Sequence, residues 1–259
     1  MSETASEPLL RIKGVGKQFG TITALDGVSF DVRAGEVVAL LGDNGAGKST
    51  LVKIISGSQH ADTGQMWFDG EERRFASPHE AKQAGIETVY QDLSLCPNVD
   101  VVANFFMGRE WTRNVMGLKV LRERDMLDET GRAMDEVGTT IQDLRAKVET
   151  LSGGQRQAIE LSRFVHWGGK LVLLDEPFAA LGVAQTRRGL ELIDRVKQKG
   201  IAVIVITHNM LHAFQVADRL IVLRHGTVVG EKQKDQTTPE EIIELITGET
   251  FGAGLRAAR

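Results

Sequence analysis

Short apolar runs typical of β-strands occur toward both ends of the chain. LLRIKGV, VSFDV and VVALL, all before residue 42, are separated by glycines, and this pattern predicts strands joined by tight turns. QMWF and RRF flank the turn pair Asp69-Gly70, and RLIVL and TVVGE flank His225-Gly226, so each pair predicts a β-hairpin. We therefore expect an antiparallel β subdomain in addition to the main sheet.

Segments with helical signals alternate with further apolar strands. The helical segments are 49–56, 77–85, 184–199 and a stretch opened by Thr238-Pro239-Glu240-Glu241. Glycines stand at the ends of the first three, and two of the four begin with a capping residue followed by proline. The strands between them are IETVY, Leu171 to Leu174 and IAVIVI. This alternation predicts an α/β fold with a mostly parallel core sheet.

The stretch from about residue 98 to 150 lacks such β-type runs. Its apolar positions follow helical spacing, at Met126, Thr130, Ala133, Met134 and Val137. We predict a helical subdomain, residues 98–165, inserted into an α/β core formed by residues 9–97 and 166–248. Residues 249–259 carry little pattern and are expected to form a loose tail.

Composition and charge narrow the class of protein. With 259 residues, 42% of them hydrophobic, the chain is long enough for one large domain, 1–259, that carries a smaller subdomain. Lys and Arg number 31 against 35 Asp and Glu, a net charge of −4, so the chain lacks the positive field of nucleic-acid-binding proteins and no nucleic acid partner is expected. The polar start MSETASEP lacks the features of a secretory signal, and the apolar runs are far shorter than the roughly 20 residues that cross a bilayer as a helix. Any association with a membrane is therefore expected to occur through a partner. The lone Cys96 can form no intrachain disulfide, which agrees with a cytosolic location.

A glycine-rich segment between the strand VVALL and the next helix matches the phosphate-binding pattern G-x-x-x-x-G-K-[ST]. Its residues are Gly42, Asp43, Asn44, Gly45, Ala46, Gly47, Lys48 and Ser49. The glycines allow successive backbone N–H groups to surround phosphate oxygens, and the following helix adds its positive dipole end. Lys48 is predicted to reach the β and γ phosphates of ATP, Ser49 to bind Mg²⁺ and Thr50 to donate a hydrogen bond to a phosphate.

A second candidate element is the acidic pair Asp175-Glu176, which follows the apolar strand Leu171 to Leu174. In an open α/β sheet, the carboxyl end of such a strand lies beside the phosphate loop. Asp175 is therefore predicted to orient Mg²⁺ through its water shell. Glu176 is the candidate general base for an attacking water.

The string Leu151-Ser152-Gly153-Gly154-Gln155 resembles the LSGGQ signature of the ATP-binding cassette (ABC) family, a resemblance that covers about residues 9 to 230. It implies a P-loop NTPase fold in which two cassettes face each other head to tail, each completing the nucleotide site of the other. The γ phosphate would then be contacted in trans by Ser152, Gly153, Gly154 and Gln155. Because the chain has one phosphate loop and one signature, a homodimer is the expected assembly. Taken alone, the string would also serve as a helix cap.

The same resemblance assigns three further residues. Gln91, after the strand IETVY, matches the glutamine that senses Mg²⁺ and the γ phosphate. His208, after IAVIVIT, matches the switch histidine that contacts the γ phosphate, and Phe19 matches the aromatic residue that stacks on adenine. Where the family often has Ser-Ala-Leu-Asp after the acidic pair, this chain has Ala179-Ala180-Leu181-Gly182, which puts cross-dimer coupling through that aspartate in doubt.

Within the family the chain resembles bacterial monosaccharide import ATPases, through GDNGAGKSTLVKIISG, GIETVYQDLSL, NFFMGRE and AALGV. The resemblance implies an ATPase on the cytoplasmic face of the bacterial inner membrane, with membrane permease subunits and, indirectly, a periplasmic sugar-binding protein as partners. The segment from Asp92 to Arg109 would contact the permease, with Phe105, Phe106 and Met107 either as docking anchors or as core. An exporter subunit, or a non-transport ABC ATPase acting on nucleic acid or ribosomes, is the alternative. The sequence does not identify the sugar.

Overall fold

The computed structural model describes residues 7–89, 95–167, 169–178 and 182–249, with the side chains of residues 157, 161 and 185 left aside. The chain forms two compact units. The first unit holds residues 1–88, 169–177 and 193–259, and the second holds residues 89–168 and 178–192.

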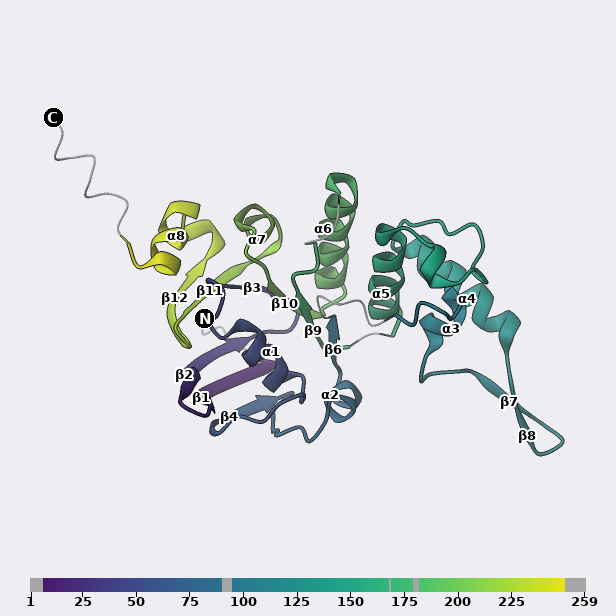
Figure 1. The fold of residues 1–259 in the computed structure, drawn as a ribbon, viewed down its shortest axis with the longest axis horizontal. Coiled ribbons are helices and arrows are strands. Elements are labelled where there is room, and N and C mark those ends of the chain that lie inside the picture. Colours follow the sequence, from purple (N-terminus) through teal and green to yellow (C-terminus); the bar gives the residue numbers. More distant parts are fainter. Residues whose placement is uncertain (1–6, 90–94, 168, 179–181, 250–259) are drawn as a thin grey trace, which may run out of the picture. The chain divides into compact units, whose positions relative to one another are not determined.

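The first unit contains a six-stranded sheet in the order β12-β11-β3-β10-β9-β6 (Figure 1). Its strands are β3 Val37–Leu41, β6 Ile86–Val89, β9 Leu171–Asp175, β10 Ala202–Ile206, β11 Arg219–Arg224 and β12 Thr227–Gln233. β11, β3, β10 and β9 run parallel, and β12 pairs antiparallel with β11. Residues of β3, β10 and most of β9 are at most 2% exposed, because both faces of a parallel sheet are covered; this explains their unbroken apolar sequences. The predicted mostly parallel α/β core is confirmed.

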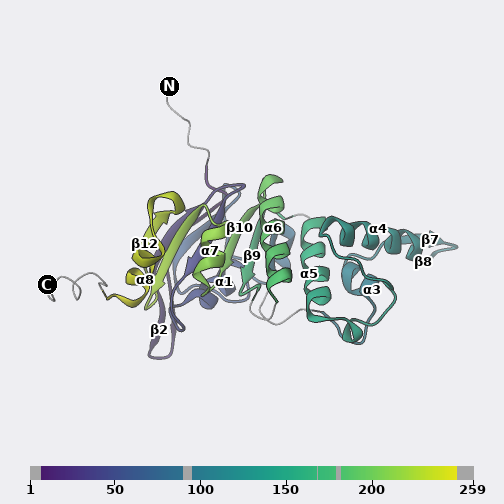
Figure 2. The same cartoon turned by 90° about the horizontal axis from the view of Figure 1, so that it is seen from above.

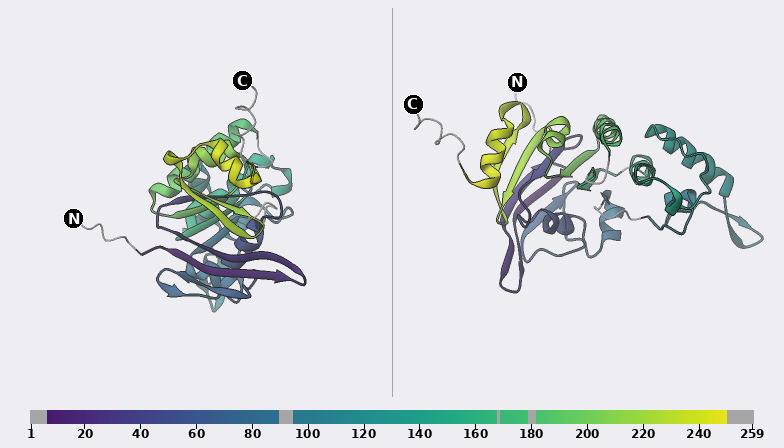
Figure 3. Two further views of the ribbon diagram at one scale, coloured as in Figure 1. Left: turned by 90° about the vertical axis from the view of Figure 1, so that its left-hand side faces the viewer. Right: turned by 45° about the horizontal axis from the view of Figure 1, so that its top comes forward.

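A second, antiparallel sheet in this unit has the order β2-β1-β4-β5. Its strands are β1 Leu10–Phe19, β2 Ile22–Val32, β4 Thr63–Phe68 and β5 Glu71–Glu72. Figure 3 shows the β1–β2 hairpin as a long ribbon in purple. The predicted hairpin around Asp69-Gly70 forms, but its return strand is only two residues long instead of covering RRF. The chain leaves the sheet there, and Phe75 is buried with its ring edge-to-face on Phe68, the ring centroids being 6.5 Å apart.

The sequence signals predict the helices over residues 48–55, 78–84 and 239–247 of the first unit, but not the one over residues 210–216. These helices are α1 Lys48–Ile55, α2 Pro78–Ala84, α7 Met210–Val216 and α8 Pro239–Thr247, with the 3-10 turn Lys234–Gln236 before α8. Ser77 and Thr238 cap α2 and α8 through their side chains, and both helices have proline in the first turn. Helix α8 lies beside β12 and β11 (Figure 2), with Ile242 fully buried in the cluster that holds Leu220 and Val222. Helix α6, Val183–Gln198, contributes its residues up to 192 to the second unit and the rest to the first.

The second unit is mainly helical. Its helices are α3 Val101–Phe106, α4 Glu123–Glu136 and α5 Gly153–Trp167, with the 3-10 turn Val148–Thr150. The predicted periodicity is confirmed at Met126, Thr130, Ala133 and Met134, which are buried in α4, whereas Val137 lies just past the end of the helix and is only partly buried. Phe105 and Phe106 are both fully buried in the core of this unit, so their interpretation as docking anchors is wrong.

The prediction that residues 98–150 contain no β-structure is wrong. These residues contain a β-hairpin, β7 Thr112–Val115 and β8 Leu118–Leu121. Both strands have only four residues and both are exposed along their whole length, so they show neither the length nor the alternation that marks a half-buried strand. Among the described residues, no helix is long and apolar enough to span a membrane.

Candidate functional site

The glycine-rich loop connects β3 to α1 in the first unit, in the strand–loop–helix order that the motif requires. Gly42, Gly45 and Gly47 have φ angles of 150°, 81° and 104°. A Cβ atom on Gly42 would lie 2.3 Å from the Leu223 carbonyl oxygen, and one on Gly47 would lie 2.5 Å from the Ala24 carbonyl oxygen. Both glycines are therefore required by the packing of the loop against neighbouring backbone as well as by conformation.

The side chain of Lys48 lies over this loop. Its Nζ donates to the carbonyl oxygens of Gly42 at 2.8 Å and of Asp43 at 2.9 Å. Burial lowers the pKa of Lys48, although the charges of Glu176, Asp175 and Asp43 oppose that shift. A partly buried ammonium group held mainly by carbonyl dipoles is well suited to attract a phosphate anion.

The N-terminus of α1 is open. Gly47 stands at the N-cap position in the left-handed conformation, and no side chain caps the helix. The first turn of an α-helix carries backbone N–H groups without intrahelical acceptors, and the helix dipole makes this end positive. Ser49, which is exposed, and the partly buried Thr50 add hydroxyl groups to the same turn. The loop, Lys48 and this turn together form a ready anion site.

Two carboxylates follow from β9, as predicted. Asp175 is the last residue of the strand, and its pKa is raised by burial and by the charge of Glu176, against the opposing charges of Lys48 and Lys53. Glu176 has a left-handed backbone, with φ of 50°, and its amide donates to the Ile206 carbonyl oxygen at 2.9 Å. This bond turns the Glu176 side chain toward the end of the neighbouring strand β10.

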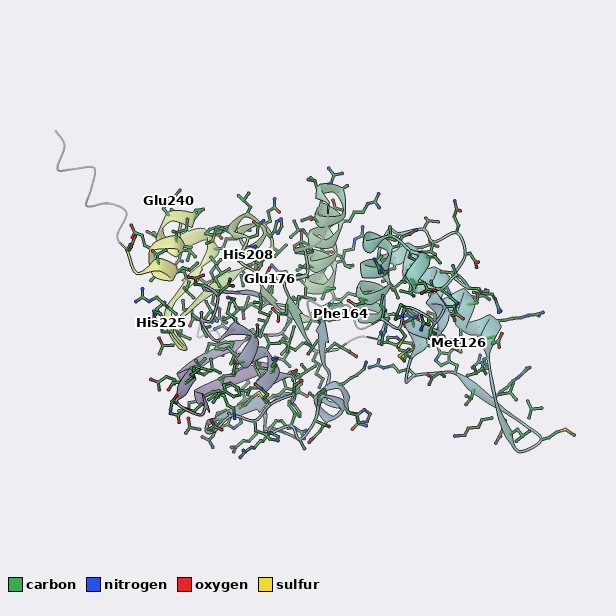
Figure 4. The ribbon with its side chains drawn as sticks, viewed as in Figure 1. Met126, Phe164, Glu176, His208, His225 and Glu240 are labelled. Atoms are coloured by element: carbon green, nitrogen blue, oxygen red, sulfur yellow. The ribbon has the colours of Figure 1, made fainter. Side chains whose placement is uncertain are left out.

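At that position Glu176 meets His208, a contact that the sequence interpretation did not predict. Glu176 Oε1 accepts a hydrogen bond from the His208 backbone N–H at 2.9 Å and lies 2.8 Å from His208 Nδ1 (Figure 4). The Thr207 hydroxyl donates to Glu176 Oε2 at the longer distance of 3.4 Å. The Glu176 side chain is 16% exposed and that of His208 is 73% exposed. Since β9 and β10 are adjacent parallel strands, residues just beyond their carboxyl ends are neighbours, and this rule was the available signal.

In the second unit, the signature residues form the start of α5. The Ser152 hydroxyl accepts from the Gln155 backbone N–H at 3.3 Å, and Gln155 Oε1 accepts from the Ser152 backbone N–H at 3.1 Å. This reciprocal arrangement is a capping box. Gly153 is exposed and Gly154 is partly buried in the first turn of the helix. The interpretation of the string as a helix cap is thus confirmed as its local structure in this chain.

The remaining predicted residues differ in what the structure describes. Phe19 ends β1, is 44% exposed, and has Lys17 Nζ 5.5 Å from its ring centroid. Gln91 lies outside the described residues, as do Ala179, Ala180 and Leu181, whereas Gly182 is described and its carbonyl oxygen accepts from the Thr186 N–H at 3.0 Å.

Comparison with known proteins assigns a family to this site. Residues 25–179 match the family model described as "ABC transporter". The xylose/arabinose import ATP-binding protein of Sulfolobus acidocaldarius is 47% identical, over 94% of this chain and 96% of that protein. The fructose import ATP-binding protein of Rhizobium meliloti is 44% identical, over 94% of this chain and 95% of that protein. A dimeric ATP-binding cassette solved in a post-hydrolysis state with ADP and phosphate shares the fold, with a TM-score of 0.74 at 24% identity over 87% of this chain and 98% of that one.

Proposed function

The chain belongs to the ABC transporter family, and on that premise we propose that it is the ATP-hydrolysing subunit of an importer for a monosaccharide. The observation that carries this proposal is the geometry of the first unit, where an open phosphate loop, a half-buried lysine and a Glu176–His208 pair belong to one sheet and its loops. The proposal of a monosaccharide as cargo is supported by the two sugar import relatives, which match over nearly their whole length.

In this proposal the loop residues Gly42 to Ser49 hold the phosphates of ATP. Lys48 exchanges its two carbonyl acceptors for β and γ phosphate oxygens, which are stronger, charged acceptors. Thr50 donates to a phosphate from the first turn of α1. Phe19 presents its ring to the adenine base. The hairpin that carries Phe19 packs against the phosphate loop, because a Cβ atom added to Gly47 would lie 2.7 Å from Leu25, which pairs with Lys17 in that hairpin.

Magnesium fits the groups available. Among the described residues, no group of three or more His, Cys, Asp or Glu side chains is arranged to hold a metal ion. Mg²⁺ in nucleotide sites takes one or two protein oxygens and completes its shell with phosphates and water. The Ser49 hydroxyl and the Gln91 side chain are proposed as such donors, and the Asp175 carboxylate is proposed to orient the ion through its water shell. When bound, the ion would neutralise charge on the transferring phosphate.

Glu176 is proposed as the general base and His208 as the residue that positions it. Two hydrogen-bonding groups of His208 hold Oε1, whereas among the residues that the structure describes Oε2 has only the 3.4 Å contact with Thr207. Oε2 is therefore the oxygen free to take a proton from water. As the water oxygen bonds to the γ phosphorus, the bond to the β–γ bridging oxygen breaks, ADP leaves with that electron pair, and the proton passes to Glu176.

The assembly proposed is a homodimer that joins a membrane permease on its cytoplasmic side, where a periplasmic sugar-binding protein would deliver the cargo from outside. The dimer is supported by the solved dimeric cassette of the same fold. In it Ser152, Gly153, Gly154 and Gln155 of one copy would meet the nucleotide of the other, and residues 92–109 would contact the permease. A dimer would make the rate per molecule rise with protein concentration.

The test replaces Glu176 with Gln in the purified chain. Because the substitution removes the base and keeps the shape, ATP binding should persist while the rate of Mg²⁺-dependent hydrolysis falls by roughly 10² to 10⁴-fold. Glu240→Gln, on the exposed start of α8, is the control and should hydrolyse ATP like the wild type. In vesicles with the cognate permease, Glu176→Gln should also abolish sugar uptake. If Glu176→Gln hydrolysed ATP at the wild-type rate, Glu176 would not be the general base. If the wild-type complex in vesicles moved sugar in the export direction, the protein would belong to an exporter.

A further inference from the structure

The β7–β8 hairpin of the second unit has a mainly apolar face that is exposed in the described part of the chain. Residues directly opposite each other in an antiparallel pair share a face, and so do alternate residues along a strand. Arg113, Val115, Leu118 and Val120 therefore lie on one face. Val115 and Val120 are each 42% exposed and Leu118 is 72% exposed. The other face is mainly polar, with Thr112, Asn114 and Lys119 beside Leu121.

The turn of this hairpin extends the apolar face. It consists of Met116 and Gly117, both with positive φ, 50° and 84°, as a two-residue turn of this kind requires. Asn, Asp or Gly fits the first of these positions without strain, but the chain has a methionine there, 101% exposed. A large apolar side chain thus stands at the tip against the preference of the backbone. An isolated two-stranded hairpin is only marginally stable in water, so a surface that buried its apolar tip would stabilise it.

The charge of the hairpin identifies the kind of surface. Residues 112–121 include Arg113 and Lys119, both exposed, and no Asp or Glu. Just after the hairpin, Arg122, Glu123, Arg124 and Asp125 are all exposed and add no net charge, so the positive charge belongs to the hairpin itself. The cytoplasmic loops of membrane proteins carry an excess of Lys and Arg, so a permease would present a surface of the same sign. The cytoplasmic leaflet of a membrane is anionic, attracts basic segments and accepts apolar side chains below its headgroups.

We propose that the β7–β8 hairpin is a lipid-contacting element that inserts Met116, Leu118 and their apolar neighbours into an anionic bilayer surface, with Arg113 and Lys119 against the headgroups. The proposal rests on the proposed function to the extent that the latter brings the chain to a membrane. Figure 1 shows the hairpin extending away from α3 and α4, the helices of its own unit. Lipid contact here would give the subunit a direct hold on the membrane, in addition to any hold through a permease.

The experiment is cosedimentation of the full chain with vesicles of mixed phosphatidylglycerol and phosphatidylcholine, and with vesicles of phosphatidylcholine alone. We expect binding to the anionic vesicles, weaker binding at high salt and little binding to the neutral ones. Met116→Asn with Leu118→Thr removes the apolar tip and retains residues that suit a turn and a strand; binding should fall roughly tenfold or more. Arg113→Gln with Lys119→Gln should lower binding by about fivefold for each charge removed.

Ile243→Gln is the matched control, because Ile243 is an exposed apolar residue, 37% exposed, on α8 of the other unit; it should bind vesicles like the wild type. All variants should retain wild-type ATP hydrolysis in solution, since none changes a proposed catalytic or nucleotide-binding residue. If the wild-type protein hydrolysed ATP but did not bind anionic vesicles, the lipid proposal would be wrong and the proposed ATPase function would stand. Vesicle binding that neither hairpin variant weakens, or hairpin variants that lose only their association with the permease, would also overturn the lipid proposal.

Discussion

The N-termini of α1 and α5 both begin at glycine-containing loops, and they are built in opposite ways. At α1 the N-cap residue is Gly47. Within the described part of the chain, no side chain caps this helix, and the side chain of its first residue, Lys48, is held by carbonyl oxygens of the loop. At α5 the Ser152 and Gln155 side chains satisfy each other's backbone N–H groups. The first end is open to an anion; at the second, the capping box has already satisfied two of the N–H groups that an anion could use, those of Ser152 and Gln155.

The difference indicates different tasks for the two helix ends. An unfilled helix terminus beside a lysine binds phosphate without first losing an interaction. A phosphate that contacts the Ser152 hydroxyl or either capped N–H group replaces an internal hydrogen bond of the capping box, so the net gain from such a contact is small. We infer that α1 supplies the affinity for nucleotide, while α5 responds only when the partner copy brings a bound nucleotide to it.

The largest effect is expected for Lys48→Met. This change removes the cation that faces the β and γ phosphates while preserving side-chain length. ATP affinity should fall by roughly 100-fold or more, because charge-assisted bonds to phosphate are the strongest available at this site. Lys53→Met, in the last turn of the same helix and exposed, is the control and should bind ATP nearly as well as wild type. Titration of a fluorescent ATP analogue measures both. Equal affinities for the two variants would contradict the assignment of α1 as the main phosphate seat.

How far the sequence predicted this molecule depends on how local each signal was. The phosphate loop, the acidic strand end and the caps of α2 and α8 were all predictable, because each is encoded by adjacent residues with one physical role. The Glu176–His208 contact joins residues from two strands, and it became visible only once β9 and β10 were neighbours in the sheet. Helix α7 was not predicted, although Asn209 caps it by accepting a hydrogen bond from the His212 N–H at 3.3 Å.

Two errors in the second unit have one physical cause. Whether an apolar segment is buried in the core or exposed at the surface depends on tertiary packing, which the local sequence does not reveal. Phe105 and Phe106 belong to an aromatic cluster with Trp111 and Trp167, whereas the comparably apolar tip of the β7–β8 hairpin is exposed. The four-residue strands of that hairpin are too short for a period-2 pattern to stand out from a loop.

An intermediate effect is expected for Phe19→Ala, which tests whether the open end at α1 belongs to a site for a whole nucleotide. Stacking of a base on an aromatic ring contributes about 1 to 3 kcal/mol, so ATP affinity should fall by roughly 5- to 100-fold. Pyrophosphate, which has no base, should bind both proteins alike. Ile22→Ala is the control, since Ile22 pairs with Phe19 across the hairpin and is 68% exposed. Calorimetric titrations with ATP and with pyrophosphate separate the base from the phosphates. If Phe19→Ala weakened both ligands equally, Phe19 would have a structural role in the hairpin and no contact with the base.

The smallest effect is expected for Ser152→Ala, which tests the cap of α5. Loss of an N-cap side chain costs about 1 kcal/mol, which corresponds to a fall in the melting temperature of roughly 2 to 4 °C. Thr238→Ala removes an equivalent cap from α8, where the Thr238 hydroxyl accepts from the Glu241 N–H at 3.3 Å, and should cost a similar amount. Only Ser152→Ala should also lower the ATPase rate, because only the α5 cap is proposed to exchange its internal bonds for contacts with the partner's nucleotide. Thermal unfolding and steady-state hydrolysis measured on both variants give the comparison. If both lose stability and neither loses activity, the Ser152 hydroxyl caps its own helix and takes no part in a composite site.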